Sequence, residues 1–155
     1  TTSDTICADV CVTGASSLTI DGNGNGDFDG FQEAADYLNC AGVSSALTIT
    51  VKDGTYEERV NLGTINGASA TNTIRFVGES TDAKLTSTYS TYPDFKTLTL
   101  DGAKHVTFDS LTIEAGGGTY GWAVHLMNAA DSNTVRNCVI NAPENGSTNY
   151  SSGIT

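Results

Sequence analysis

Residues 21–62 have the sequence DGNGNGDFDGFQEAADYLNCAGVSSALTITVKDGTYEERVNL, and this stretch predicts how the chain begins to fold. Its first half contains apolar residues at i, i+3, i+4 and i+7, the spacing of one buried helical face. These residues are Phe31, Ala34, Ala35 and Leu38. Leu47, Ile49 and Val51 then alternate with polar residues, as in a half-buried strand. We therefore predict a glycine-rich loop, a short amphipathic helix, a strand, and a turn at residues 53–54 into a second strand.

Two signals mark the ends of the predicted helix. Asp29 stands three residues before Gln32, so the pair can form a capping box at the N-terminus. Gly42 can close the C-terminus. A single helix ahead of a run of strands is expected to cover the open end of a β-solenoid.

A repeat follows residue 97. The segment VTFDSLTIEA (residues 106–115) matches NTVRNCVINA (residues 133–142), 27 positions later, with Phe108 on Val135 and Leu111 on Cys138. Shorter matches place residues 98–100 on residues 124–126 and residues 119–125 on residues 149–155. Repeats of this length with short strands are typical of a parallel β-helix, in which each coil is buried on its neighbours. We predict an all-β fold, a right-handed single-stranded parallel β-helix with an N-terminal capping α-helix.

The length of 155 residues favours a single domain. We divide it into an arm (residues 1–16), the cap helix with the first coil (residues 17–62) and further coils (residues 63–155). The last coil begins close to residue 155, which would leave a strand edge uncovered. We therefore expect the chain to be the N-terminal part of a longer solenoid, with more coils of the same chain or a neighbouring subunit at that end.

The formal net charge is −11, from 18 acidic and 7 basic residues, and the basic residues form no cluster in the sequence. Nucleic acid is excluded as a partner on this basis, because binding its phosphates needs clustered Lys and Arg. No apolar run is long enough to span a membrane, so no membrane insertion is expected.

Four cysteines are present, without a CxxC metal pair. In an exported chain, Cys7 or Cys11 would pair with Cys40 and fasten the N-terminal segment to the cap helix; a local Cys7–Cys11 bond is the alternative. Cys138 lies in an inward-facing position of the repeat and is predicted to be a buried free thiol. This pattern favours an oxidising, extracellular setting.

Three runs resemble the opening of pectinesterase-like proteins in the pectin lyase-like superfamily of right-handed β-helices. They are DGNGNGDFDGFQEAADYL (residues 21–38), ALTITVKDGTYEERVNL (residues 46–62) and IRFVGES (residues 74–80). Gly54, Tyr56 and Glu58 match the GxYxE pattern of that family. The resemblance covers residues 19–80 and, more loosely, the repeat after residue 97; exported bacterial β-helix proteins that look non-catalytic open in the same way.

The resemblance carries over no catalytic residue. Pectinesterases have a QAVAL stretch whose Gln helps to hold the oxyanion, whereas the comparable run here is Trp122-Ala123-Val124-His125-Leu126. Trp122 cannot take that role. The two catalytic aspartates and the arginine of the family would lie beyond residue 155.

The loop that precedes the helix has a second interpretation, as a calcium site. Oxygen-bearing side chains stand at positions 1, 3, 5, 7 and 9 with glycine at position 6, as in an EF-hand loop. The candidate ligands are Asp21, Asn23, Asn25, Asp27 and Asp29. Position 12 is Gln32, so the bidentate Glu is missing. The alternative is a polar glycine turn with Asp29 as helix cap.

Other polar residues give weaker signals. His105 and His125 lie at strand edges among polar residues. We therefore expect them to be ordinary surface histidines rather than parts of a nucleophile–histidine site. Glu57 and Glu58 should point to opposite faces of a strand, so they form no carboxylate pair, and Glu58 is expected to pair with Arg59 or Arg75.

The glycine-rich segment of residues 116–122 carries two aromatic rings, Tyr120 and Trp122, and Tyr150 repeats the first position one coil later. Exposed rings can stack on sugars, so these three residues are candidate carbohydrate-binding groups; in the alternative, Trp122 packs over the coil edge. Asn145 and Asn149 begin glycosylation sequons that matter only in a eukaryotic host.

These observations favour a non-enzymatic, structural or adhesive segment of an exported β-helix protein, secreted or on a bacterial cell surface. The alternatives are the N-terminal part of a polysaccharide-active enzyme of the pectinesterase or lyase type, or a carbohydrate-binding β-helix. Calcium is the one cofactor that the sequence suggests, and a polysaccharide is a candidate partner.

Overall fold

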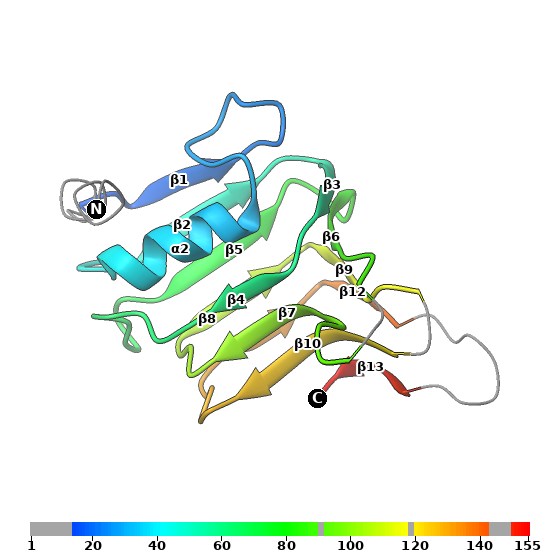
Figure 1. Ribbon diagram of the computed structural model, residues 1–155. Helices are drawn as coiled ribbons and strands as arrows, with labels where there is room; N and C mark the ends of the chain where they lie inside the picture. The colour runs from blue at the N-terminus through cyan, green and yellow to red at the C-terminus, as the bar shows by residue number, and fades with distance from the viewer. Residues whose placement is uncertain (1–13, 90–91, 118–119, 143–149) are drawn as a thin grey trace, which may run out of the picture.

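The computed structural model describes residues 14–89, 92–117, 120–142 and 150–155, which form a parallel β-helix (Figure 1). The elements before and within the first coil are β1 (Ser17–Ile20), α2 (Phe31–Ala41), β2 (Leu47–Val51), β3 (Gly54–Glu57) and β4 (Val60–Leu62). The second coil has β5 (Ile74–Gly78), β6 (Ala83–Thr86) and β7 (Lys96–Asp101), and the third has β8 (Val106–Asp109), β9 (Thr112–Glu114) and β10 (Tyr120–Met127). The fourth has β11 (Thr134–Arg136), β12 (Val139–Asn141) and β13 (Tyr150–Ile154).

Each coil contributes one strand to each of three parallel sheets. Sheet A has the order β1-β2-β5-β8-β11, sheet B the order β3-β6-β9-β12, and sheet C the order β4-β7-β10-β13. Four coils therefore stack on one another, as Figure 1 shows. The predicted fold, an all-β parallel solenoid with one short helix, is confirmed.

The strand register also confirms the sequence repeat. Phe108 pairs with Val135 in sheet A, and Ile113 pairs with Ile140 in sheet B. In sheet C, residues 98 and 100 pair with residues 124 and 126, and residue 120 pairs with residue 150. Equivalent positions lie directly above one another, because each inward side chain packs on the same position of the next coil.

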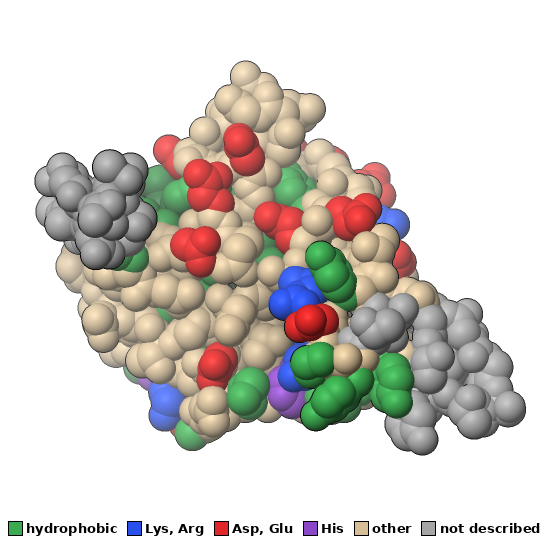
Figure 2. Space-filling model, viewed as in Figure 1, with side chains coloured by type: hydrophobic (Ala, Val, Ile, Leu, Met, Phe, Trp, Pro, Cys, Tyr) green, Lys and Arg blue, Asp and Glu red, His purple; other side chains and the backbone are tan. Residues whose placement is uncertain are grey.

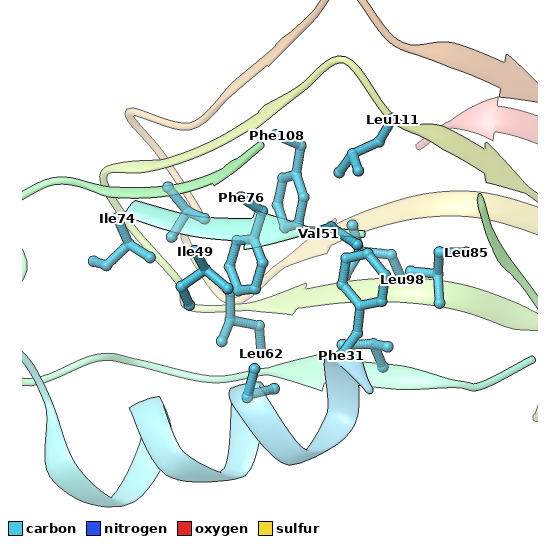
Figure 3. Packing of buried hydrophobic residues seen from close by; sticks show 14 of the residues in the cluster. Phe31, Ile49, Val51, Leu62, Ile74, Phe76, Leu85, Leu98, Phe108 and Leu111 are labelled. Atoms are coloured by element: carbon cyan, nitrogen blue, oxygen red, sulfur yellow. The ribbon is translucent and has the colours of Figure 1, made fainter. Parts of the chain in front are cut away.

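Stacked aromatic rings form the centre of the core (Figure 3). The rings of Phe76 and Phe108, in neighbouring coils, are 5.0 Å apart at an interplanar angle of 8°. Phe31 of the helix stacks on Phe76 at 6.0 Å and contacts the edge of Tyr56. The helix therefore continues the core of the solenoid.

Helix α2 lies over the first coil beside β4 (Figure 1). Its apolar face is buried as the periodicity predicts, and Leu38 is fully buried. The polar side of the helix contacts the backbone of β4: Gln32 Oε1 accepts from the Asn61 N–H at 2.9 Å, and Asn39 Oδ1 accepts from the Gly63 N–H at 2.8 Å. These side chains satisfy backbone groups at the outer edge of sheet C, which would otherwise be open to another strand.

The predicted capping box is wrong. The N-cap is Gly30, and Asp29 and Gln32 do not cap the helix together. The Phe31 N–H instead donates to Glu58 Oε2 at 2.7 Å, and the Asp29 N–H donates to Glu33 Oε2 at 2.8 Å. A side chain at Gly30 would collide with the Glu58 carboxylate, so glycine gives Glu58 the space to reach the helix end.

Two further expectations about this region can be compared with the structure. Gly42 ends the helix as predicted, with φ of 69° and its N–H bound to the Leu38 carbonyl at 2.9 Å. The expectation that Glu58 pairs with Arg59 or Arg75 is wrong, because its carboxylate binds the amide of the helix and the two arginines bind aspartates.

The fourth coil is the most exposed part of the described solenoid. The side chains of Val139 and Ile154 are 42% and 52% exposed. Cys138 has a free thiol, as predicted, but it is half-buried rather than buried, because no described coil packs on its outer side.

Candidate functional site

The outer face of sheet C gathers polar and aromatic side chains from three coils. Trp122 of β10 pairs in register with Lys96 of β7. Three residues further along the strands, Thr99 pairs with both Asn61 of β4 and His125 of β10. Parallel stacking without offset therefore forms two rows that run across the strands.

An aromatic cluster lies at the first of these rows; we define it as Tyr92, Phe95, Tyr120 and Trp122. Phe95 is central and only 5% exposed: its ring centroid is 4.8 Å from Trp122, 5.4 Å from Tyr120 and 6.0 Å from Tyr92. Tyr92 is 77% exposed, and Trp122 is half-buried. Trp122 thus packs on its neighbours and still presents part of its ring to the solvent.

A hollow of about 200 Å³ adjoins the cluster on the same face. Its lining residues are Arg59, Val60, Asn61, Pro93, Asp94, Lys96, Thr99 and Met127. Lys96 connects the two features: its side chain lines the hollow, and its Nζ lies 5.6 Å from the Phe95 ring centroid and 6.0 Å from the Trp122 ring centroid. The hollow and the aromatic cluster together form one candidate binding surface, which we call the sheet C face.

Charged groups of both signs line this face. The Arg59 guanidinium binds Asp94 at 2.6 Å and lies 4.9 Å above the ring of Tyr89. Figure 2 shows basic, acidic, histidine and hydrophobic side chains side by side over the strands of sheet C, with other acidic side chains spread over the helix end of the molecule.

His125 lies against Trp122, with ring centroids 4.9 Å apart, and its Nδ1 is 2.9 Å from the Thr155 hydroxyl. Burial lowers the pKa of His125, and the positive charge of Lys96 lowers it further. The imidazole therefore favours the neutral form, which presents a polar edge without adding charge to this face.

The structure brings two of the three predicted carbohydrate-binding residues together. Tyr120 and Trp122 both contact Phe95, and the strand register places Tyr150 beside Tyr120. The sequence did not identify Phe95 and Tyr92 as candidate binding residues, because both lie in the irregular segment that precedes β7. The only available signal was the high density of aromatic residues at positions 89–95.

The glycine loop is a hydrogen-bonded turn. Asp21 Oδ1 accepts from the backbone and side-chain nitrogens of Asn23, at 2.9 and 3.0 Å. Asp27 Oδ2 accepts from the Thr19 N–H at 2.8 Å, and the side chain of Asn25 donates to the Asn23 carbonyl at 3.5 Å. Within the part of the chain that the structure describes, no three His, Cys, Asp or Glu side chains gather as a metal-binding group. Calcium binding by the loop stays a prediction.

Glu57 and Glu58 have different hydrogen-bond partners. Glu57 Oε1 accepts from the Thr88 hydroxyl at 3.2 Å, while Glu58 caps the helix. The predicted disulfides stay untested, because Cys7 and Cys11 lie outside the described residues, whereas Cys40 lies in the last turn of α2. Asn145 and Asn149, which begin the two sequons, also lie outside the described residues.

A carboxylate network on the outer face of sheet A was missed in the sequence. Asp109, which is 6% exposed, accepts hydrogen bonds from Arg75, Arg136, Ser110 and Asn137. The hydrogen bond from Asn137 is the largest cause, followed by those from Arg136 and Ser110, of a pKa lowered to about 2. The 27-residue repeat was a usable signal, because it places Arg136 beside Asp109.

Comparison with solved structures shows the fold. The structure matches a pectin methylesterase from carrot with a TM-score of 0.60 and 18% sequence identity, over 83% of this chain and 40% of that chain. It matches a deglycosylated pectin methylesterase from Aspergillus niger with a TM-score of 0.62 and 20% identity, over 84% of this chain and 45% of that chain. The chain thus shares the β-helix fold of these enzymes and spans less than half of their length.

No protein-family model matches the sequence, and no curated protein matches it. Among the described residues, the helical segments are too short or too polar to cross a membrane.

Proposed function

We propose that this chain is a non-enzymatic adhesive element of an exported β-helix protein, and that it binds polysaccharide through the sheet C face. The observation that carries the proposal is the aromatic cluster beside the hollow. Aromatic rings offer flat apolar faces to the C–H faces of sugar rings, and the polar edges of Tyr and Trp can bind hydroxyl groups. The hollow supplies Asn61, Thr99 and Lys96 as further polar partners.

The scaffold supports this proposal. Trp122 and Lys96 lie on strands whose backbones are hydrogen-bonded on both sides, in the second and third of four coils. Groups on rigid strands hold their relative positions more closely than groups on loops. Such a face suits a repetitive polymer, because recognition needs little rearrangement of the protein.

The fold match gives the proposal a chemical context. Its solved neighbours are named as pectin methylesterases, so a polysaccharide is the ligand class that their names indicate. The enzymatic alternative is that this chain forms part of a pectinesterase- or lyase-type enzyme. It has the same fold match in its favour, and release of methanol or of unsaturated products from pectin would support it.

Trp122 is the only tryptophan of the chain, which allows a direct test. We expect titration with a soluble polysaccharide to change its emission, since the ring lies within the proposed surface. Affinity electrophoresis through gels that contain polysaccharide should retard the protein, and Trp122→Ala and Tyr92→Ala should reduce the retardation. Tyr37→Ala is the control, because Tyr37 packs on Phe28 at the helix and not on sheet C.

The proposal fails if no acidic or neutral polysaccharide changes the emission of Trp122 or retards the protein. It also fails if Tyr37→Ala weakens the retardation as much as Trp122→Ala does, because the ligand would then not lie on sheet C.

A further inference from the structure

Lys96 differs from the other basic residues of the chain in its ionic contacts. The chain has seven Lys and Arg residues, and six of them form ion pairs with aspartates or glutamates. The pairs are Lys52–Glu79, Arg59–Asp94, Arg75–Asp109, Lys84–Glu114, Lys104–Asp131 and Arg136–Asp109. Lys96 forms no ion pair with an acidic side chain of the described residues, although acidic residues of the chain outnumber basic ones by 18 to 7.

The surroundings of Lys96 hold its charge in a fixed place. The ammonium group lies over the rings of Phe95 and Trp122, and the side chain lines the hollow. Cation–π contacts orient an ammonium group without neutralising it. A positive charge that is positioned between stacking surfaces and a hollow can therefore still bind a negatively charged group of a ligand.

We infer that Lys96 selects the charge of the ligand: the sheet C face binds an acidic polysaccharide whose free carboxylates pair with Lys96, in preference to the same polymer with its carboxylates methyl-esterified. This inference rests on the proposed function. Esterification removes the negative charge and leaves the sugar rings that would stack on Tyr92 and Trp122. The free acid and the ester therefore differ at the group that Lys96 would contact.

The charge of the whole chain favours a saccharide over another polyanion. With a net charge of −11, the protein repels polyanions at long range, so binding must depend on short-range contacts. A sugar acid provides two of these, stacking on the aromatic cluster and one ion pair. An acidic polypeptide provides the ion pair without a ring in every unit.

The test compares binding of polygalacturonate and of its methyl-esterified form at neutral pH, by Trp122 emission and affinity electrophoresis. We expect wild-type protein to bind the free acid about tenfold or more tightly than the ester, as for one charge-assisted hydrogen bond. Lys96→Gln should lose this preference and bind the acid and the ester equally, no more tightly than the wild type binds the ester. Lys96→Arg should retain the preference, because it keeps the charge and the cation–π contacts.

Lys84→Gln is the matched control, because it removes the same charge from sheet B, where Lys84 pairs with Glu114. It should keep the full preference, and thermal melting of each variant will show that it is folded. Higher salt should weaken wild-type binding of the acid more than binding of the ester.

The possible results separate the inference from the proposed function. Equal binding of acid and ester by the wild type, or a preference that survives in Lys96→Gln, overturns the inference and leaves the proposed function standing. Binding of neither polymer, nor of any neutral polysaccharide, overturns both. Binding of poly-glutamate as tight as that of polygalacturonate overturns the saccharide assignment, because the face would then bind polyanions in general.

Discussion

The carboxylate of Glu58 accepts a 2.7 Å hydrogen bond from the backbone N–H of Phe31, so a residue of the first coil caps the helix that covers that coil. Phe31 begins the helix and also stacks on Phe76 in the core. One side chain thus couples the start of the helix to the position of the aromatic stack. The negative charge is also favourable at a helix N-terminus, where backbone N–H groups lack partners.

We expect Glu58→Ala to lower the free energy of unfolding by about 1–2 kcal/mol, as for the loss of a helix cap. Glu57→Ala, at the neighbouring exposed position, should cost less than about 0.5 kcal/mol. Chemical denaturation of the two variants checks this difference. Equal costs would mean that the Glu58 contact does not stabilise the helix.

Leu38 tests whether the helix belongs to the core of the solenoid. Its side chain is fully buried, so Leu38→Ala should cost about 2–5 kcal/mol, as for a large-to-small change in a core. Asp36→Ala, on the exposed side of the same helix, serves as the control. A cost for Leu38→Ala close to that of the control would show that the helix does not cover the first coil.

Asp109 should make stability depend on pH in strongly acidic solution. Its pKa is lowered from 3.8 to about 2, so the unfolded chain binds this proton at a higher pH than the folded protein does. The ionised carboxylate of Asp109 therefore stabilises the folded protein fully above about pH 4, and this stabilisation is lost as the pH falls through 2. We expect Asp109→Asn to be less stable than wild type at pH 6, with the difference largely gone near pH 2. Urea unfolding at several pH values checks this, and a constant difference would contradict it.

His125 should titrate below its usual pKa of 6.5, because burial and Lys96 both disfavour its charged form. Since the unfolded chain binds the proton more readily, this group should lower stability as the pH falls below 6.5. NMR titration of the two histidines gives the pKa directly. We expect Lys96→Gln to raise the pKa of His125 and Lys84→Gln to leave it unchanged; a pKa that does not respond to Lys96→Gln would refute the coupling.

Calcium binding by the glycine loop remains open to a calorimetric test. Titration should give heat of binding if the loop is a calcium site, and Asp21→Ala combined with Asp27→Ala should abolish it. Because both carboxylates also hold the turn, thermal melting of the double variant must show that it is folded. Asp36→Ala is the matched control, because it removes an exposed carboxylate outside the loop. No heat at millimolar calcium would remove the metal prediction and leave the hydrogen-bonded turn.

Periodicity was enough to predict the solenoid. Leu47, Ile49 and Val51 alternate with polar residues, and Phe108 recurs as Val135. The alternation is a short-range pattern, because one side of each strand is buried. The coil repeat is periodic, because equivalent positions of neighbouring coils stack on one another. For the same reason, the repeat placed residues 120 and 122 in register with residues 150 and 152. The prediction of a flexible loop over residues 116–122 is wrong at its end, because strand β10 begins at Tyr120.

Contacts between different sides of a coil could not be predicted in this way. Glu58 meets Phe31, and Phe95 gathers Tyr92 with Trp122, although no fixed spacing relates these positions. Such contacts depend on the path of the irregular segments between strands and on the space that a residue such as Gly30 leaves open. Side-chain charge alone also could not single out Lys96, because its lack of a carboxylate partner among the described residues depends on how all the coils stack.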